Sequence, residues 1–229
     1  MRSRRSDQNP LLEYFEGNPD RLIHKWMHYF DIYHRHFAPW RGRPVTVVEF
    51  GVFHGGSLQM WKHYFGRDAR IFGVDIEPRC KEMEERQVEI LIGDQEDREF
   101  LRSVREHVGP VDIVIDDGGH QMHQQIVTFE ELFPHVQPHG VYLCEDLHTS
   151  YVSSYGGGYR KEGTFVERAK SLVDGLHGFY EGKPQVDPAL RADDFTRSAH
   201  SLHFYDSIVV IEKRPMSPPK SLRVGEPSF

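Results

Sequence analysis

The chain has 229 residues, enough for one α/β domain with a full hydrophobic core. Its net charge of −7 and pI near 6.1 argue against nucleic acid or an anionic membrane as a partner. Its two cysteines, Cys80 in a polar stretch and Cys144 in an apolar run, do not suggest a disulfide framework. Without an apolar run of about 18 residues or a signal-peptide pattern, the sequence predicts a cytoplasmic protein.

Residues 1–44 are expected to form an N-terminal helical arm. Residues 1–19 are polar and contain two prolines, which predicts a loose arm with one short helix. From Arg21 to Phe37 the apolar residues recur at helical spacing, and Asp20 can cap the resulting helix. Such a helix packs on the sheet or on a partner subunit, and we expect a homo-oligomer.

Residues 45–65 predict the strand, glycine loop and helix that open a doubly wound α/β sheet. The pattern is Glu49-x-Gly51-x-x-x-Gly55-Gly56-Ser57, which lacks the G-x-G-x-x-G of a dinucleotide site. An acidic residue beside the first glycine suits a cationic ligand better than a diphosphate. The pattern resembles the first motif of S-adenosylmethionine-dependent methyltransferases, so Glu49, Gly51, Gly55 and Ser57 are candidate cofactor contacts.

The second and third predicted strands, Arg70–Ile76 and Val88–Ile92, are each associated with polar residues suited to a nucleoside. Asp75 lies where an acidic residue accepts hydrogen bonds from ribose hydroxyls in this kind of fold, although it can also be an exposed loop carboxylate. Asp94 and Gln95 can reach an adenine edge, although Gly-Asp is also ordinary turn chemistry.

The rest of the chain completes a seven-stranded, mostly parallel, Rossmann-like sheet with an antiparallel C-terminal hairpin. Strands are expected at Val111–Ile115, at Val141–Cys144 and twice within His200–Lys213. Further helices are expected over residues 79–86, 97–107, 124–133 and 165–176.

The domain is therefore placed at 45–213, followed by a loose tail at 214–229. Residues 149–164, rich in Ser, Tyr and Gly, are a candidate lid over the acceptor. The acidic excursion at 181–198 is expected to help the lid choose that acceptor.

Acidic residues follow the fourth and fifth strands, whose ends lie about 4.8 Å apart in this topology. Asp117, Glu145 and Asp146 would repel one another unless a cation lies between them, and oxygen ligands favour Mg²⁺ over zinc. His120, in the same loop as Asp117, is a suitable general base, and Asp116 is a further candidate cofactor contact. Alternatively, Asp116 or Asp117 only caps a helix and His120 is exposed.

The segment IDDGGHQMHQQIVTFEELFPHVQPHGVYLCEDLHTSY resembles the metal-dependent sugar O-methyltransferases of antibiotic biosynthesis, the macrocin and mycinamicin type. Cephalosporin-hydroxylase-like proteins are similar. The likeness covers about residues 45–213 and is strongest at 48–57, 115–120 and 144–151. Gly119 stands where a serine is expected, and the long N-terminal domain of larger members is missing, which leaves oligomeric contacts and part of the acceptor pocket open.

The resemblance implies S-adenosylmethionine and Mg²⁺ as cofactors, with Asp117, Glu145 and Asp146 as metal ligands and His120 as base. It also implies a sugar hydroxyl of a glycosylated natural product as the acceptor. Three alternatives stay open: an aminosugar N-methyltransferase that takes an aminoglycoside, a non-catalytic S-adenosylmethionine-binding accessory protein, and a nicotinamide oxidoreductase, which the missing glycine motif disfavours.

Overall fold

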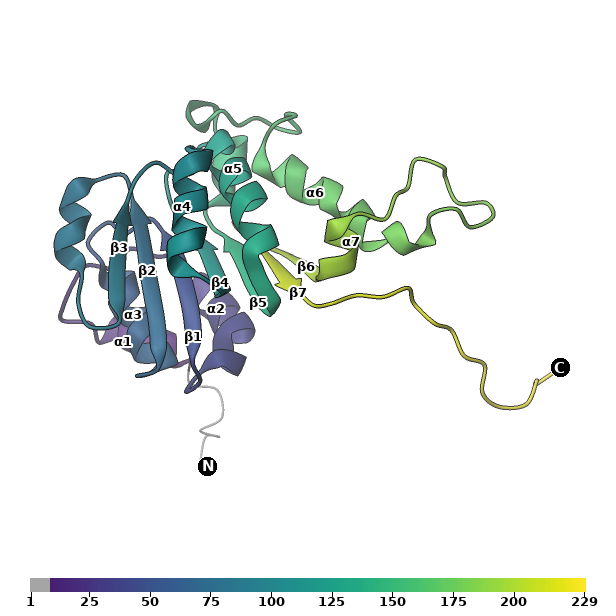
Figure 1. Ribbon diagram of the computed structural model, residues 1–229, viewed down its shortest axis with the longest axis horizontal. Helices are drawn as coiled ribbons and strands as arrows, with labels where there is room; N and C mark the ends of the chain where they lie inside the picture. The colour runs from purple at the N-terminus through teal and green to yellow at the C-terminus, as the bar shows by residue number, and fades with distance from the viewer. Residues whose placement is uncertain (1–8) are drawn as a thin grey trace.

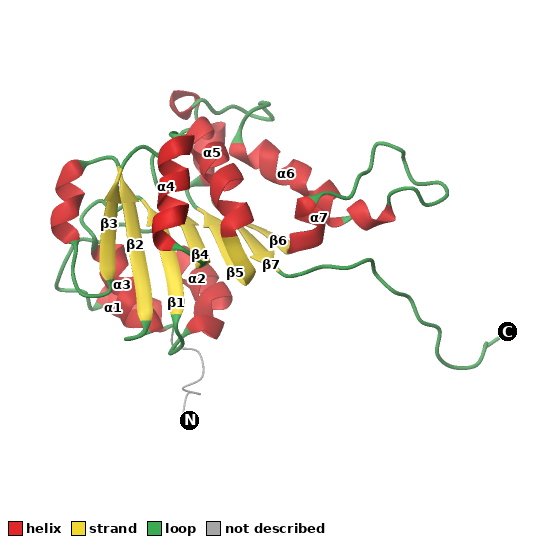
Figure 2. Ribbon diagram, in the orientation of Figure 1, coloured by secondary structure: helices red, strands yellow, loops and turns green. Residues whose placement is uncertain are grey.

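One mixed β-sheet organises the protein, as the computed structural model, which describes residues 9–229, shows in Figures 1 and 2. The strand order is β3-β2-β1-β4-β5-β7-β6, with the first five strands parallel and β7 antiparallel to both of its neighbours. The strands are β1 (Val45–Phe50), β2 (Ala69–Asp75), β3 (Val88–Ile92), β4 (Val111–Asp116), β5 (Val136–Cys144), β6 (Ala199–Tyr205) and β7 (Ile208–Lys213). The predicted doubly wound sheet with its C-terminal hairpin is therefore confirmed.

Helices cover both faces of the sheet (Figure 1). They are α1 (Pro10–Glu16), α2 (Tyr29–Phe37), α3 (Gly56–Phe65), α4 (Arg98–Val108), α5 (Met122–Leu132), α6 (Phe165–Leu176) and α7 (Asp194–Ser198). The helices α1 to α3 share one hydrophobic core with the sheet, and α4 to α7 share the other. Strand β1 serves both cores, since Val47 faces the first while Val48 and Phe50 face the second, which explains its nearly continuous apolar sequence.

The helix predicted from Arg21 to Phe37 is wrong in its first half, because α2 begins only at Tyr29. Residues 18–28 are irregular, and the Asp20 side chain caps no helix there. The apolar spacing is misleading here, since Leu22 and Trp26 are more than half exposed. From Asn9 onward the N-terminal arm is more ordered than predicted, because α1 packs against the core through buried Leu11. The first eight residues of the predicted arm lie outside the described part of the chain.

Two other boundaries differ from the sequence prediction. The helix expected at 79–86 is a short 3₁₀ helix, Pro78–Met83, and the fifth strand begins at Val136, five residues before the predicted start at Val141. Both cysteines are free, and both are buried, although Cys80 comes from a polar stretch of the sequence. Residues 214–229 contain no helix or strand.

A buried histidine connects α2 to the C-terminal hairpin. The His36 Nδ1 atom lies 2.8 Å from Glu212 Oε1, and its Nε2 atom lies 2.9 Å from the Tyr205 hydroxyl oxygen. His203 joins the group, with possible metal-ligand atoms of His36, His203 and Glu212 all within 4.8 Å of one another. The ring nitrogens of His36 both have hydrogen-bond partners, so this cluster is explained as a packing contact between α2 and the sheet edge.

The free energy of unfolding is expected to decrease as the pH is lowered, and His36 is expected to cause part of this decrease. Burial lowers the pKa of His36 despite the neighbouring Glu212, so the folded state resists protonation. The resulting stability is present above the ordinary histidine pKa of about 6.5 and is lost as the pH falls through that value. In urea titrations between about pH 7.5 and 5.5, His36→Gln should show a smaller pH dependence and a loss of about 1–3 kcal/mol at the upper pH. An unchanged pH slope in the variant would contradict this account.

Candidate functional site

A cavity of about 710 Å³ opens at the carboxyl ends of β1, β2 and β4. This is where the strand order reverses around β1, which is the usual ligand site in an open α/β sheet. Of the predicted cofactor contacts, five line the cavity: Gly51, Ser57, Asp75, Asp94 and Gln95. Its rim is apolar, because lining residues Leu22, Phe53 and Ile76 are exposed by 56%, 62% and 66%.

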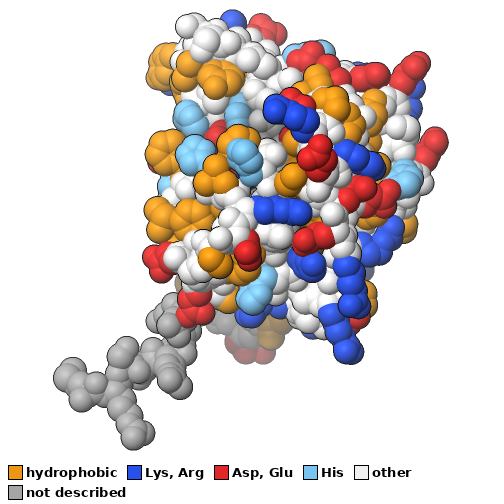
Figure 3. Space-filling view, turned by 90° about the vertical axis from the view of Figure 1, so that its left-hand side faces the viewer, with side chains coloured by type: hydrophobic (Ala, Val, Ile, Leu, Met, Phe, Trp, Pro, Cys, Tyr) orange, Lys and Arg blue, Asp and Glu red, His pale blue; other side chains and the backbone are white. Residues whose placement is uncertain are grey.

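Figure 3 shows one face of the molecule, on which basic and acidic side chains are interspersed and hydrophobic and histidine side chains gather toward one side. None of the helices within residues 9–229 is both long and apolar enough to cross a bilayer.

The predicted ribose acid, Asp75, orders the loop that follows β1. Its Oδ2 atom accepts hydrogen bonds from the Val52 and Phe53 N–H groups at 2.8 and 3.2 Å, and Oδ1 accepts one from Glu77 N–H at 2.9 Å. A carboxylate has about four acceptor positions, so Asp75 retains capacity for a ligand hydroxyl. This geometry is compatible with the predicted binding of a ribose hydroxyl, and it gives Asp75 a second role in ordering the loop after β1.

Three predicted cofactor contacts, Glu49, Gly55 and Asp116, do not line the cavity. Glu49 is fully buried and accepts a hydrogen bond from Ser57 Oγ at 2.7 Å. Gly55 precedes α3 in a left-handed conformation that turns the chain into the helix. These residues shape the site from behind rather than facing it.

Asp116 supports the loop that follows β4. Its Oδ1 atom accepts a hydrogen bond from Gln95 Nε2 at 3.1 Å, and Oδ2 accepts one from the Tyr142 hydroxyl at 3.3 Å. Burial raises the pKa of Asp116. Gln95 Oε1 in turn accepts the Gly119 N–H at 2.8 Å, so the pair fixes the loop that carries Asp117 and His120.

Gly51 lets the loops after β1 and β4 approach closely. It has φ +90°, and a Cβ atom there would lie 2.0 Å from the Asp117 carbonyl oxygen. We expect Gly51→Ala to lower the free energy of unfolding by about 3 kcal/mol or more, since it combines overpacking with backbone strain. Gly42→Ala is the matched control, because Gly42 also has a positive φ but a Cβ atom there meets nothing within 4 Å. Equal urea midpoints for the two variants would show that the close approach is unimportant.

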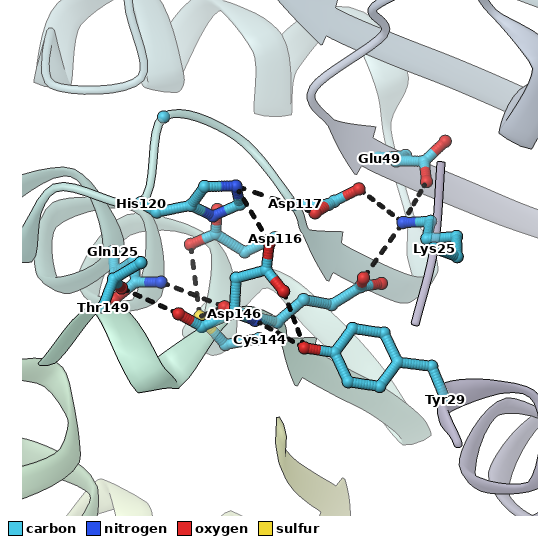
Figure 4. A network of polar contacts seen from close by, with 12 residues as sticks. Lys25, Tyr29, Glu49, Asp116, Asp117, His120, Gln125, Cys144, Asp146 and Thr149 are labelled. Atoms are coloured by element: carbon cyan, nitrogen blue, oxygen red, sulfur yellow. Dashed lines mark hydrogen bonds and ion pairs between the residues drawn. The ribbon is translucent and has the colours of Figure 1, made fainter. Parts of the chain in front are cut away.

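Lys25 is one of two site residues that were not predicted from the sequence (Figure 4). Its side chain is 3% exposed, and its ammonium contacts Asp117 Oδ2 directly, lies 3.0 Å from Glu145 Oε2 and lies 3.6 Å from Glu49 Oε1. Burial opposes its charge, but the three carboxylates outweigh burial and hold the pKa of Lys25 well above its usual value. No local signal marked this lysine, because its partners are 92 and 120 residues away for Asp117 and Glu145.

Asp117, His120 and Asp146 form an open polar corner beside that ion-pair cluster (Figure 4). His120 Nε2 lies 3.4 Å from Asp146 Oδ2 and 3.9 Å from Asp117 Oδ1, and possible ligand atoms of all three residues lie within 4.8 Å of one another. His120 and Asp146 both have positive φ, a strained conformation that clusters at functional sites. Tyr29 from α2, also missed by sequence reasoning, donates a hydrogen bond to Asp146 Oδ1 at 2.6 Å and fixes that carboxylate.

The predicted metal ligands are thus brought together only in part. Asp117 and Asp146 share the open corner, whereas Glu145 is buried and turned toward Lys25. Among the described residues, Glu145 Oε1 and His120 Nδ1 are buried atoms without a hydrogen-bond partner. The carboxylate oxygens of Asp117, Asp146 and Glu145 are ligands that suit a hard divalent cation. Glu145 would have to give up its ion pair with Lys25 in order to bind such a cation.

The predicted lid does not cover the cavity in this structure. Segment 149–164 contributes no lining residue, and Figure 1 places it above the start of α6, close to α5. Backbone hydrogen bonds hold the segment, including those from Gly157 N–H to Val152 O at 3.0 Å and from Gly158 N–H to Ser150 O at 2.8 Å. Its role as a lid stays a prediction, as does the role of the excursion at 181–198.

The fold and this site have the arrangement expected of a Rossmann-like methyltransferase. A glycine loop follows β1, an acid ends β2, and an acidic corner lies at the ends of β4 and β5 beside the cavity. Residues 48–147 match the family described as "Methyltransferase domain". This match supports the predicted enzyme class.

Curated proteins similar to this chain are named as O-methyltransferases of glycosylated natural products. The chain is 42% identical over 197 residues to an 8-demethyl-8-alpha-L-rhamnosyl tetracenomycin-C 2'-O-methyltransferase of Streptomyces olivaceus, covering 82% of this chain and 51% of that protein. It is 38% identical to the demethylmacrocin O-methyltransferase of Streptomyces fradiae, covering 84% and 51%. The predicted resemblance to sugar O-methyltransferases of the macrocin and mycinamicin type is confirmed, and the chain spans about half the length of the curated relatives it matches.

A solved structure agrees with this likeness. The mycinamycin-pathway methyltransferase MycE, in complex with Mg, SAH and mycinamycin VI, is 33% identical and superimposes with a TM-score of 0.76. The likeness covers 90% of this chain and 53% of that one.

Proposed function

We propose that the protein transfers a methyl group from S-adenosylmethionine to a sugar hydroxyl of a glycosylated natural product, as an enzyme of antibiotic biosynthesis that uses Mg²⁺. The observation that carries the proposal is the position of the Asp117–His120–Asp146 corner at the edge of the cavity that also contains Asp75. The relatives named as sugar O-methyltransferases, and the neighbour solved with Mg and SAH, support the same chemistry.

The chain's own residues divide into cofactor and acceptor sides. Asp75 accepts the ribose hydroxyls, and Asp94 and Gln95 line the cavity where the adenine would lie. Gly51 lets the reactive end of the cofactor approach the acidic corner, where Asp117 and Asp146 would hold Mg²⁺, joined by Glu145 once it leaves Lys25.

When bound, the sulfonium supplies an electrophilic methyl group and Mg²⁺ supplies Lewis-acid polarisation of the acceptor hydroxyl. His120 takes the proton of that hydroxyl on Nε2, which already faces the two acids. The deprotonated acceptor oxygen would then bond to the methyl carbon as the carbon–sulfur bond breaks, which would release S-adenosylhomocysteine. Alignment by the cavity provides much of the rate, because the donor is already activated.

The test is to measure S-adenosylhomocysteine release with matched glycosides that carry either a hydroxyl or an amine at the same sugar position. We expect turnover with the hydroxyl compound, loss of turnover in EDTA and recovery with added Mg²⁺. Turnover only with the amine would favour an aminosugar N-methyltransferase, and cofactor binding without any turnover would favour an accessory protein. Undiminished turnover in EDTA would refute the role of the metal.

The proposal includes assembly as a homo-oligomer in the cytoplasm. The mass of the protein in solution, from light scattering, tests the assembly, and a monomer would contradict it.

A further inference from the structure

We propose that Lys25 is an exchangeable counter-cation, whose ammonium holds Asp117 and Glu145 in the place of a divalent ion and withdraws when the ion enters. This inference rests on the proposed function, because it concerns the same acidic site. It adds a residue from the N-terminal segment to that site, and it couples ion binding to the wall of the cofactor cavity.

The ammonium uses the oxygens that an ion would need. Lys25 contacts Asp117 Oδ2 and lies 3.0 Å from Glu145 Oε2, and both carboxylates were expected to bind the metal. The remaining Asp117 oxygen, Oδ1, faces His120 and Asp146. An ion that binds both Asp117 and Glu145 would therefore meet the ammonium on the same carboxylates, and two cations this close repel each other.

One positive charge does not satisfy this cluster. Glu49 and Glu145 are both fully buried and share the single ammonium of Lys25 with Asp117, and among the described residues Glu145 Oε1 is a buried atom without a hydrogen-bond partner. Exchange of the ammonium for a doubly charged ion would compensate more of this negative charge.

Lys25 lies on a segment that can move without breaking a helix or strand. Residues 18–28 are irregular, and Trp26 and Met27 next to Lys25 are each 54% exposed. Side-chain anchors include Asn18 Nδ2, which donates to Arg21 O, and Arg21 Nη1, which donates to Met83 O, both at 2.8 Å. Withdrawal of Lys25 would therefore break its ion pairs and strain these anchors, but it would break no helix or strand.

The same segment forms part of the cavity wall. Leu22, Ile23 and His24 line the cavity together with Lys25. A Cβ atom on Gly56 would lie 2.4 Å from the Leu22 carbonyl oxygen, so the segment lies directly against the start of α3. Movement of Lys25 would therefore reshape the wall on which the cofactor is expected to lie, so that ion and cofactor binding influence each other.

The rival explanation is a permanent brace. Lys25 would then stay on Glu145 while the ion binds only Asp117 Oδ1 and Asp146. The two explanations differ in what the N-terminal segment does when the ion binds, and this difference can be measured without turnover.

The first measurement compares Mn²⁺ binding, followed by electron paramagnetic resonance, in the wild type, Lys25→Met and Lys62→Met. Lys62 is the matched control, because it is a lysine of α3 that lies outside the acidic cluster. Its Nζ atom lies 2.9 Å from Glu85 Oε1. We expect Lys25→Met to bind Mn²⁺ at least about tenfold tighter than the wild type, a difference of about 1.4 kcal/mol, and Lys62→Met to match the wild type. An affinity of Lys25→Met within twofold of the wild type would overturn the exchange.

The second measurement uses the wild type alone, so it does not depend on the folding of a variant. Hydrogen exchange of amides in residues 18–28 should become faster when Mg²⁺ is added, and Trp26 emission should change, because its ring lies 5.9 Å from that of His148. The emission change should disappear in Trp26→Phe. Binding of the ion with unchanged or slower hydrogen exchange in this segment would establish the brace and overturn the proposal.

The Mn²⁺ measurement also separates this inference from the proposed function. If neither the wild type nor either lysine variant binds Mn²⁺, both this inference and the metal in the proposed function fail. Equal binding by the wild type and both variants refutes the inference alone.

Discussion

Asp117→Asn is expected to lower the rate of methyl transfer by about a thousandfold or more, while binding of S-adenosylhomocysteine stays within a few fold of the wild type. Asp117 serves both halves of the site, because Oδ2 contacts Lys25 and Oδ1 faces His120 and Asp146. An amide keeps the shape but loses the charge that would attract the ion. Initial rates and calorimetric titration with S-adenosylhomocysteine separate the two effects.

Asp112→Asn is the matched control for that experiment. Asp112 lies on β4, the strand that Asp117 follows, and accepts a hydrogen bond from Thr46 N–H at 2.8 Å; it does not line the cavity. Its amide variant should keep close to the wild-type rate. A loss of less than tenfold in Asp117→Asn, or an equal loss in both variants, would rule out the assigned role of Asp117.

His120→Ala should lower the rate of methyl transfer by about 10²–10⁴-fold, the range typical of a lost general base. Cofactor binding should change little, because Nε2 of His120 faces Asp117 and Asp146, on the acceptor side of the cavity. Initial rates and the affinity for S-adenosylhomocysteine check both expectations.

His123→Ala controls for the loss of a histidine from this part of the chain. His123 lies three residues further on, in α5, and its side chain is exposed. It should behave like the wild type. A loss of less than about tenfold in His120→Ala, or an equal loss in both variants, would show that another group takes the proton.

Part of the site was predictable because it depends on strand ends. Apolar runs located β1 to β4 to within a residue at each boundary, and acids that follow adjacent parallel strands must meet at one edge of the sheet. The proximity of Asp117 to Asp146 followed from this rule, as did that of His120, which shares a loop with Asp117. The direction of each side chain did not follow, and Glu145 turned toward the interior.

The N-terminal segment shows the limit of periodicity. Spacing of apolar residues between Leu22 and Phe37 suggested one long helix, but several of the first positions are exposed and the chain is irregular there. Tertiary contacts override a weak local preference when they pair buried charges, as Lys25 pairs with Glu49 and Glu145.

The doubly wound sheet, the glycine loop after β1 and the acidic edge at β4 and β5 can be predicted from the amino-acid order, because they depend on local periodicity and on which strands are neighbours. That Lys25 pairs with this edge and that Tyr29 fixes Asp146 is seen only in the folded chain. Those contacts join residues 92 to 120 positions apart, and nothing in the local pattern encodes which distant side chain fills a buried charged site.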